Sequence, residues 1–101
     1  MRNTLDGGEA ILEACRKLEC KYILSSPGTE WAPVWEAMAN QKQSGNSGPV
    51  LMDVWHETLA VDIAAGYTMA TGEMQMVLLH AGSGLLQGNM GIHGAFCAGV
   101  P

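Results

Sequence analysis

Positive charge is scarce in this chain, and the scarcity excludes several kinds of partner. Lysine and arginine together number 5 against 10 aspartate and glutamate residues, so the net charge of the 101 residues is −5. Nucleic acids and anionic membranes attract basic patches, and the sequence has none. No apolar run reaches the roughly 20 residues of a membrane-spanning helix, and the first residues lack a signal-peptide core. We therefore expect a cytoplasmic protein that binds neither nucleic acid nor membrane.

Cysteine is also sparse, being limited to Cys15, Cys20 and Cys97. Their odd number, without C-x-x-C spacing or a histidine pair, excludes a disulfide framework and a zinc site. We expect reduced thiols that pack as small hydrophobic side chains, and no metal held by this chain. Apolar residues, in contrast, make up 48% of the sequence. Because small domains bury proportionally less surface, part of this apolar material should face something outside the chain.

The apolar residues alternate between helical and strand spacing. Asp6 and Glu9 form a capping box at the start of the first helix. Helices are expected from Asp6, from Thr29 as N-cap, from Glu57 and over 84–98, and strands over 22–24, 50–55 and 76–80, with a polar loop over 43–49. This order predicts an α/β fold, a parallel sheet with helices on both faces. Three strands make a thin sheet, so residues 1–101 are expected to be a partial domain, truncated after the third strand.

The segment 50–72 organises the chain. Its apolar beginning predicts a buried strand, and the helix that follows contains a single charge, Asp62, between Thr58 and Gly72. We therefore expect this helix to be buried on nearly every side. Glu57 stands where the strand meets the helix. An acid there either complements the helix dipole or serves a functional site, and the spacing leaves both interpretations open.

Polar and glycine residues follow each predicted strand. They are Ser26-Pro27-Gly28-Thr29, His56-Glu57 and His80-Ala81-Gly82-Ser83-Gly84. Open parallel sheets bind ligands at the carboxyl ends of their strands, so these segments predict a site. We expect His80 to lie beside Glu57, and we assign His56 and His93 to packing.

The last predicted helix is rich in glycine and has no charged residue. Gly88, Gly91, Gly94 and Ala98 lie on or near one side of it. Each glycine costs a helix about 1 kcal/mol relative to alanine, so close approach of another backbone is expected. Equivalent helices meeting at a two-fold interface would supply that approach, which predicts an obligate homodimer or homotetramer.

Several of these residues occur together in one known family. His56-Glu57, Ala60, Gly66-Tyr67 and Ala70-Thr71-Gly72 match the run HE…A…GY…ATG, Pro27-Gly28 matches a Pro-Gly after the first strand, and 82–101 also lines up. Nearly the whole chain thus resembles the pyrimidine-binding domain of thiamine-diphosphate enzymes, a group that includes acetolactate synthases and benzoylformate decarboxylase. The resemblance implies the thiamine-diphosphate-binding fold.

The resemblance also implies a cofactor and roles for individual residues. Glu57 would activate thiamine diphosphate by a hydrogen bond to a ring nitrogen of its aminopyrimidine. Further cofactor contacts would come from Pro27, Gly28, Gly82, Ser83 and Gln87. On the side of the 2-oxo acid substrate, the resemblance places Thr29 together with His80, the latter as a catalytic proton donor or acceptor. Mg²⁺ and the diphosphate would be held by a later domain that this chain lacks, and active sites would lie between two subunits.

Departures from the family pattern bear on the reaction. Acetolactate-synthase-like chains usually carry threonine or serine at His80, proline at Ser83 and asparagine at Gln87. A histidine at the end of this strand, and a hydroxyl side chain at Thr29, resemble benzoylformate decarboxylase instead. The resemblance therefore implies a 2-oxo acid decarboxylase or an acetolactate-synthase-like lyase or transferase.

Two other classes remain open from the residues. The run from Gly82 to Gly88 is close to a dinucleotide-binding fingerprint, which would make this a fragment of a Rossmann-type oxidoreductase. That fingerprint needs an acidic residue about 20 positions later, and none follows Glu73. The other alternative is a non-catalytic subunit that offers an apolar, glycine-lined face to a partner.

Overall fold

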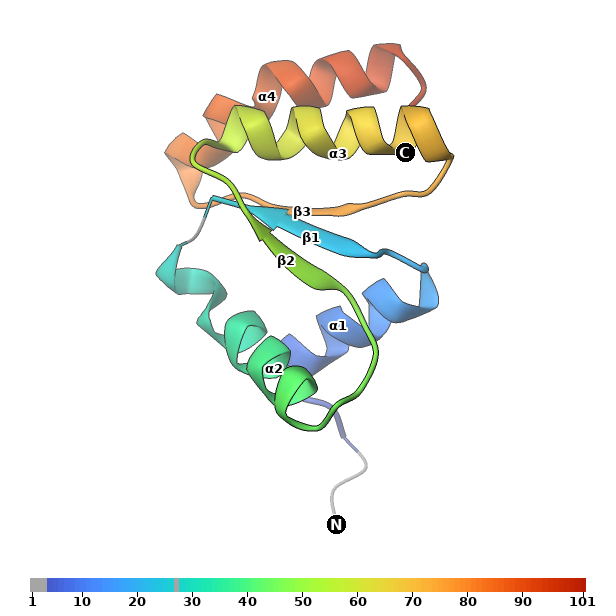
Figure 1. The fold of residues 1–101 in the computed structure, drawn as a ribbon. Helices are drawn as coiled ribbons and strands as arrows, with labels where there is room; N and C mark the ends of the chain where they lie inside the picture. The colour runs from blue at the N-terminus through green and yellow to red at the C-terminus, as the bar shows by residue number, and fades with distance from the viewer. Residues whose placement is uncertain (1–3, 27) are drawn as a thin grey trace.

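The alternation of helices and strands is confirmed by the computed structural model, which describes residues 4–26 and 28–101. A three-stranded sheet lies between two layers of helices (Figure 1). The elements are α1 (Gly7–Lys17), β1 (Tyr22–Ser25), the 3₁₀ turn η1 (Thr29–Trp31), α2 (Ala32–Gln43), β2 (Val50–Asp53), α3 (Glu57–Thr71), β3 (Met76–Leu78) and α4 (Gly82–Cys97). The predicted α/β class, with helices on both faces of a parallel sheet, is therefore confirmed.

The sheet is parallel throughout and has the strand order β2-β1-β3. Ser25 is in register with Asp53 of β2 and Leu78 of β3, so the three strands end level at one edge. The central strand β1 is buried over its last three residues. The expectation of a buried strand at 50–55 is wrong, because β2 is an outer strand whose Val50 and Leu51 are exposed.

The layer formed by α1 and α2 encloses a hydrophobic core. Asp6 caps α1 as predicted, since its side chain accepts a hydrogen bond from the backbone N–H of Glu9 at 2.9 Å. Thr29 does not cap α2, because it is the first residue of the turn η1, and α2 begins three residues later. The buried core residues of this layer are Leu12, Cys15, Cys20, Ile23, Val34, Ala37 and Leu78. Burial raises the pKa of the Cys15 and Cys20 thiols, in keeping with their packing role.

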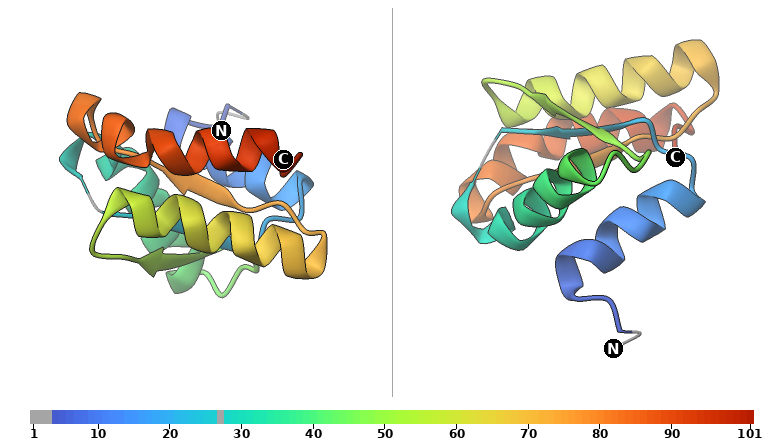
Figure 2. Two further views of the ribbon diagram at one scale, coloured as in Figure 1. Left: turned by 90° about the horizontal axis from the view of Figure 1, so that it is seen from above. Right: turned by 60° about the horizontal axis from the view of Figure 1, so that its bottom comes forward.

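Helices α3 and α4 lie side by side over the sheet (Figure 2). Glycines of α4 allow their close approach. A Cβ atom on Gly91 would lie 2.7 Å from Cγ1 of Val61, and one on Gly88 would lie 3.0 Å from Cδ1 of Leu79. The close approach that glycine permits is thus made to α3 and β3 of the same chain. The expectation that Gly88 and Gly91 face an equivalent helix of a second subunit is wrong, although a Cβ on Gly94 would meet nothing within 4 Å.

The outer side of this layer is uncovered, so the expectation that α3 is buried on nearly every side is also wrong. The sheet and α4 cover Ala60, Val61 and Ala64, but the opposite side of the helix is open. We call the exposed large hydrophobic residues of the two helices the α3/α4 apolar surface: Leu59, Ile63, Met69, Leu85, Leu86, Met90, Ile92 and Phe96.

Two residues assigned to packing on α4 are exposed instead. His93 and Cys97 lie one turn apart on the outer side of the helix, with Nε2 and Sγ 3.6 Å apart. Hydrophobic periodicity could not predict which side of α4 these two residues occupy, because almost every position of this helix is apolar or glycine. Within the described residues, no helix is long and apolar enough to cross a membrane.

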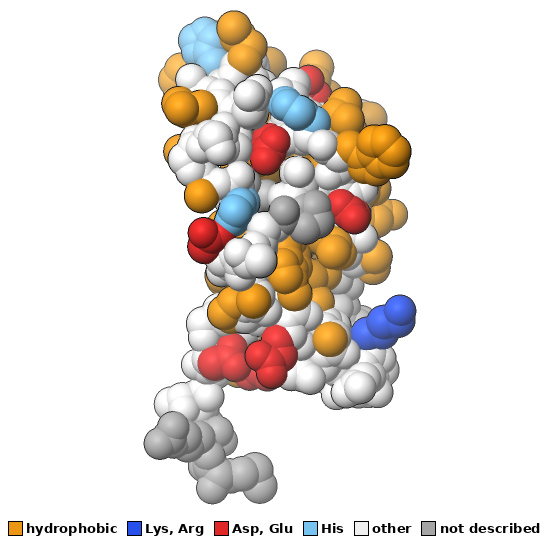
Figure 3. Space-filling view, turned by 90° about the vertical axis from the view of Figure 1, so that its left-hand side faces the viewer, with side chains coloured by type: hydrophobic (Ala, Val, Ile, Leu, Met, Phe, Trp, Pro, Cys, Tyr) orange, Lys and Arg blue, Asp and Glu red, His pale blue; other side chains and the backbone are white. Residues whose placement is uncertain are grey.

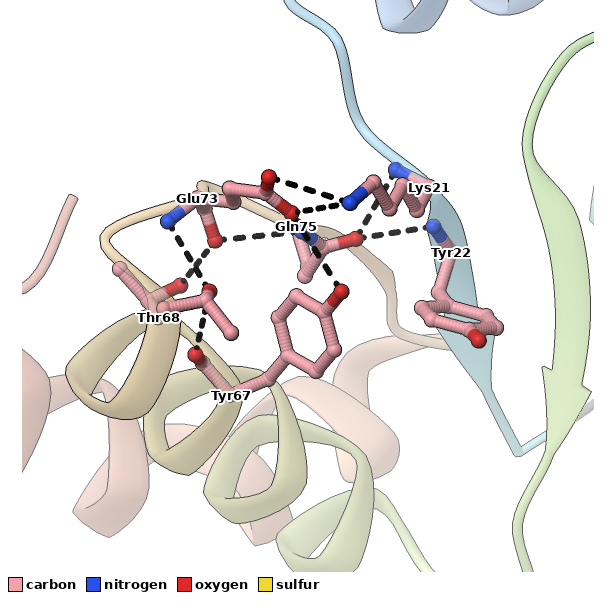
Figure 4. A network of polar contacts seen from close by, with 7 residues as sticks. Lys21, Tyr22, Tyr67, Thr68, Glu73 and Gln75 are labelled. Carbon is pink, nitrogen blue, oxygen red and sulfur yellow. Dashed lines mark hydrogen bonds and ion pairs between the residues drawn. The ribbon is translucent and has the colours of Figure 1, made fainter.

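A polar network fixes the edge of the sheet at which the strands begin (Figure 4). The buried Gln75 accepts hydrogen bonds through Oε1 from the backbone N–H groups of Lys21 and Tyr22, at 3.1 and 2.8 Å. Nζ of Lys21 lies 2.9 Å from a carboxylate oxygen of Glu73. The hydrogen bond from Lys21 lowers the pKa of the Glu73 carboxyl. These contacts stabilise the edge at which the strands begin. The candidate site lies at the opposite edge, where the strands end.

Candidate functional site

The carboxyl ends of the three strands meet the first turns of α3 and α4 at one edge of the molecule. Figure 3 looks onto this edge, where histidine and acidic side chains lie among hydrophobic ones. Three connections form it, at 26–28, 54–56 and 79–81. The sequence predicts that polar segments lie together at the carboxyl ends of the parallel strands. The structure confirms their location.

Glu57 is the first residue of α3, at the junction that the sequence predicts. His56 is exposed and caps this helix, because its Nδ1 accepts a hydrogen bond from the backbone N–H of Thr58 at 3.1 Å. The assignment of His56 to packing is therefore wrong. The cap fixes the backbone from which the Glu57 side chain departs.

The Glu57 side chain crosses to the start of α4 and covers Gly84. A Cβ atom on Gly84 would lie 2.9 Å from Oε1 of Glu57 and 3.3 Å from its Cδ. First-turn N–H groups of a helix have no partner within the helix and favour a nearby negative charge. Among the described residues, no hydrogen bond or ion pair to the Glu57 carboxyl is present. The acid is half-buried, held in place by packing and free to bind a ligand.

The residues expected to contact a cofactor from α4 lie around Glu57. Thr58 donates through Oγ1 to the backbone carbonyl of Gln87 at 2.9 Å, which ties the first turns of the two helices together. Ser83 and Gln87 are exposed. A Cβ atom on Gly82 would meet nothing within 4 Å, so this chain itself does not require glycine there. All three are accessible to a ligand at the edge.

His80 is not placed beside Glu57 as expected. Its ring packs directly on Gly28, where any Cβ atom would collide with it, and its Nε2 contacts a carboxylate oxygen of Glu30. Among the described residues, no hydrogen bond or ion pair joins His80 to Glu57. The edge therefore contains two acidic centres, one at Glu57 and one at the pair Glu30–His80. Thr29 is exposed next to this pair, and Pro27 lies outside the described residues.

Sequence reasoning missed Glu30 and the two tryptophans that position it. Trp31 donates through Nε1 to the carbonyl of Leu79 at 3.0 Å, and Trp35 donates to the carbonyl of Gly28 at 3.2 Å. Their spacing predicts core positions on a helix, and both do pack against the core. Nothing in the spacing indicates that their indole N–H groups bind the connections after β1 and β3.

Within the described residues, no group of three or more histidine, cysteine, aspartate or glutamate side chains could hold a metal ion. Such a group would be needed for a metal site formed by this part of the chain alone.

The comparison with protein families identifies a match over residues 5–101, to the family described as thiamine pyrophosphate enzyme, N-terminal TPP binding domain. The chain is also 30% identical, over 97 residues, to the acetolactate synthase large subunit of Haemophilus influenzae. The aligned part covers 96% of this chain and 16% of that protein, so the chain spans about a sixth of its relative's length. No solved structure matches the chain. Because the family match covers almost every residue, this chain belongs to the thiamine pyrophosphate enzymes, as their N-terminal TPP binding domain.

Proposed function

We propose that this chain is the cofactor-activating part of a thiamine-diphosphate enzyme that decarboxylates 2-oxo acids or couples them to a second carbonyl compound. In this proposal Glu57 binds the aminopyrimidine ring of the cofactor. The observation that carries the proposal is the Glu57 carboxyl, which is held against Gly84 at the carboxyl edge without a partner in the described chain.

The residues at this edge fit the pyrimidine end of the cofactor. A ring nitrogen needs a carboxyl group that is fixed and available, and Glu57 meets both conditions. The missing side chain of Gly84 leaves room for the acid, while Ser83 and Gln87 offer polar groups nearby. When bound, thiamine diphosphate supplies a carbon nucleophile and holds the electrons released with carbon dioxide.

The protein's own contribution is to bind, orient and move protons. Glu57 would share a proton with its ligand through a carboxylate oxygen. His80 supplies a second proton-transfer group on the side of Gly28 and Thr29. Mg²⁺ and the diphosphate need ligands that the described residues do not provide, so we propose that a later domain holds them.

Two observations bear on whether the reaction is decarboxylation or coupling, and each favours a different one of the two. The relative at 30% identity is an acetolactate synthase large subunit, which favours a coupling enzyme. His80, and the hydroxyl of Thr29 beside it, resemble the benzoylformate decarboxylase pattern and favour a lyase. We propose a 2-oxo acid enzyme in which His80 and Thr29 contact the substrate.

We also propose that the complete enzyme is a homodimer or homotetramer. The α3/α4 apolar surface supports this, because Phe96 and Met90 are 82% and 77% exposed and no charged residue interrupts α4. Apolar patches of this kind mark protein interfaces. Glu57 lies at the start of the same layer, so a second subunit could complete the site.

The test uses the full-length protein with thiamine diphosphate and Mg²⁺, and with pyruvate and benzoylformate as probe substrates. Glu57→Gln should lower turnover by about 10²- to 10⁴-fold, the usual contribution of a positioned acid or base. Glu36→Gln, an exposed glutamate on α2, is the matched control and should keep full activity. Calorimetry should show cofactor binding in the unchanged protein. Full turnover in Glu57→Gln, or no cofactor binding at all, would contradict the proposal.

A further inference from the structure

We propose that Glu30 is a positioning residue for His80: it fixes the imidazole with its proton on Nε2, so that Nδ1 is the nitrogen presented for proton transfer. The inference rests on the proposed function for the role of His80 towards a 2-oxo acid. The arrangement of the two side chains is independent of that function.

The contact between the two residues engages one ring nitrogen. Nε2 of His80 is enclosed by the protein and makes no hydrogen bond to a described residue, and the charged group in contact with it is a carboxylate oxygen of Glu30. Nδ1 is not enclosed in this way and has no hydrogen bond to a described residue. The His80 side chain is 29% exposed, so part of the ring remains open to a ligand.

The surroundings hold in place the ring of His80 and the turn that carries Glu30. The ring of His80 lies flat against Gly28, and the absence of a Cβ atom there is what makes room for it. Trp31, the residue after Glu30, anchors the turn η1 to the carbonyl of Leu79, the residue before His80. Trp35 anchors the carbonyl of Gly28. The Trp31 bond thus fixes the turn after β1 against the connection after β3, and the Trp35 bond fixes Gly28 against α2.

The chemistry follows from the donors and acceptors. A carboxylate only accepts hydrogen bonds, so its partner nitrogen must carry a proton. In neutral imidazole the other nitrogen is then an acceptor, and which nitrogen is which depends on this neighbour. With Glu30 at Nε2, Nδ1 is left as the base, or as the donor after it takes up a proton. Glu57 makes no hydrogen bond or ion pair with the ring in the described chain and does not compete for this role.

The experiment measures the tautomer directly in the full-length protein. Histidine is labelled with ¹⁵N, and the signals of His80 are assigned by their loss in His80→Gln. We expect the Nε2–H form in the unchanged protein. Glu30→Gln should populate the Nδ1–H form as well, since an amide can donate to Nε2, whereas Glu30→Asp should retain the Nε2–H form.

Kinetics then connect the tautomer to the reaction. At metal sites, loss of a partner that orients a histidine costs about 10- to 100-fold in activity, and we expect Glu30→Gln to lower kcat by a factor of the same order. Binding of thiamine diphosphate should be unchanged, and Glu36→Gln should match the unchanged protein. Trp31→Phe, which removes the anchoring N–H but keeps a ring, should lower kcat in the same direction.

Two results would overturn the inference. One is an unchanged His80 tautomer in Glu30→Gln, and the other is a loss of cofactor binding in Glu30→Gln equal to its loss of turnover. A protein that never binds thiamine diphosphate would sink the proposed function, but a tautomer change in its Glu30→Gln variant would still support the positioning of His80 by Glu30.

Discussion

The two helical layers of this molecule differ in how completely they cover their own apolar residues. Between the sheet and the helices α1 and α2, Leu12, Cys15 and Ile23 are almost inaccessible to water. On the outer side of α3 and α4, large hydrophobic side chains such as Met69 and Met90 remain exposed. The first layer completes a hydrophobic core with the sheet, whereas the second leaves large hydrophobic side chains exposed.

The difference separates the residues that stabilise the fold from those that serve the site. The α1/α2 layer has charged residues on its outer side, including Glu13 and Arg16, as a solvated layer does. The α3/α4 layer has glycines inside, hydrophobic residues outside and Glu57 at its beginning. The layer that carries the candidate catalytic acid is thus also the layer whose apolar side chains remain exposed.

The largest effect is expected from charges placed on the α3/α4 apolar surface. Leu86→Glu combined with Met90→Glu should dissociate the full-length protein and abolish activity, because a buried charge without a partner costs several kcal/mol. Ala39→Glu, at an exposed position of α2, should change neither property. Light scattering after size exclusion measures the mass. An active assembly of unchanged mass in the double variant would show that the two layers do not differ in this way.

A second comparison uses truncation in each layer. Leu12→Ala should destabilise the protein by about 2–5 kcal/mol, since it empties a closed core, and the loss should not depend on protein concentration. Met90→Ala should act through assembly, so its effect on the unfolding midpoint should change with dilution. Urea unfolding at two concentrations distinguishes them. The same concentration dependence for both variants would remove the distinction between the layers.

Two glycines of α4 allow a matched comparison in which a smaller change in stability is expected. Gly91→Ala should destabilise the protein by about 1–3 kcal/mol, the usual cost of overpacking, because the new methyl group would press on Val61. Gly94→Ala meets open space and should stabilise the helix by up to about 1 kcal/mol. Thermal unfolding of the two variants measures the difference. Equal effects would mean that α4 does not pack on α3 through Gly91.

The smallest effect is expected from the ion pair of Lys21 and Glu73, at the edge of the sheet where the strands begin. Because Lys21 lowers the pKa of Glu73, the pair contributes stability at neutral pH and loses it as the pH falls through the lowered pKa, below the ordinary value of 4.5. Lys21→Met should therefore be slightly less stable than the unchanged protein at pH 7. The difference should disappear in acid. A difference that persists at pH 2 would assign it to packing of the lysine chain instead of charge.

Local patterns in the sequence predicted much of this fold. The capping pair Asp6 and Glu9 and the strand-to-helix junction at Glu57 depend on neighbouring residues, and both are where they were expected. Level carboxyl ends follow from parallel strands, so the location of the candidate site could be predicted as well.

The remaining features depend on contacts across the fold. Whether β2 is central or outer is decided by strand order, which its apolar residues do not encode. Glycines in α4 indicate close packing but not which helix approaches, and the structure places α3 there. His80 and Glu30 are 50 positions apart in the sequence, and they meet because the ring of His80 packs on Gly28. No rule based on local spacing could predict this contact.

The central claim is that Glu57 activates the cofactor, and proton exchange at the thiazolium carbon tests it most directly. The full-length protein, its Glu57→Gln variant and its His80→Gln variant are saturated with thiamine diphosphate and Mg²⁺ and transferred to deuterium oxide. The account predicts that Glu57→Gln slows the exchange by about 10²- to 10⁴-fold, while His80→Gln leaves it unchanged. An exchange rate in Glu57→Gln equal to that of the unchanged protein would contradict it.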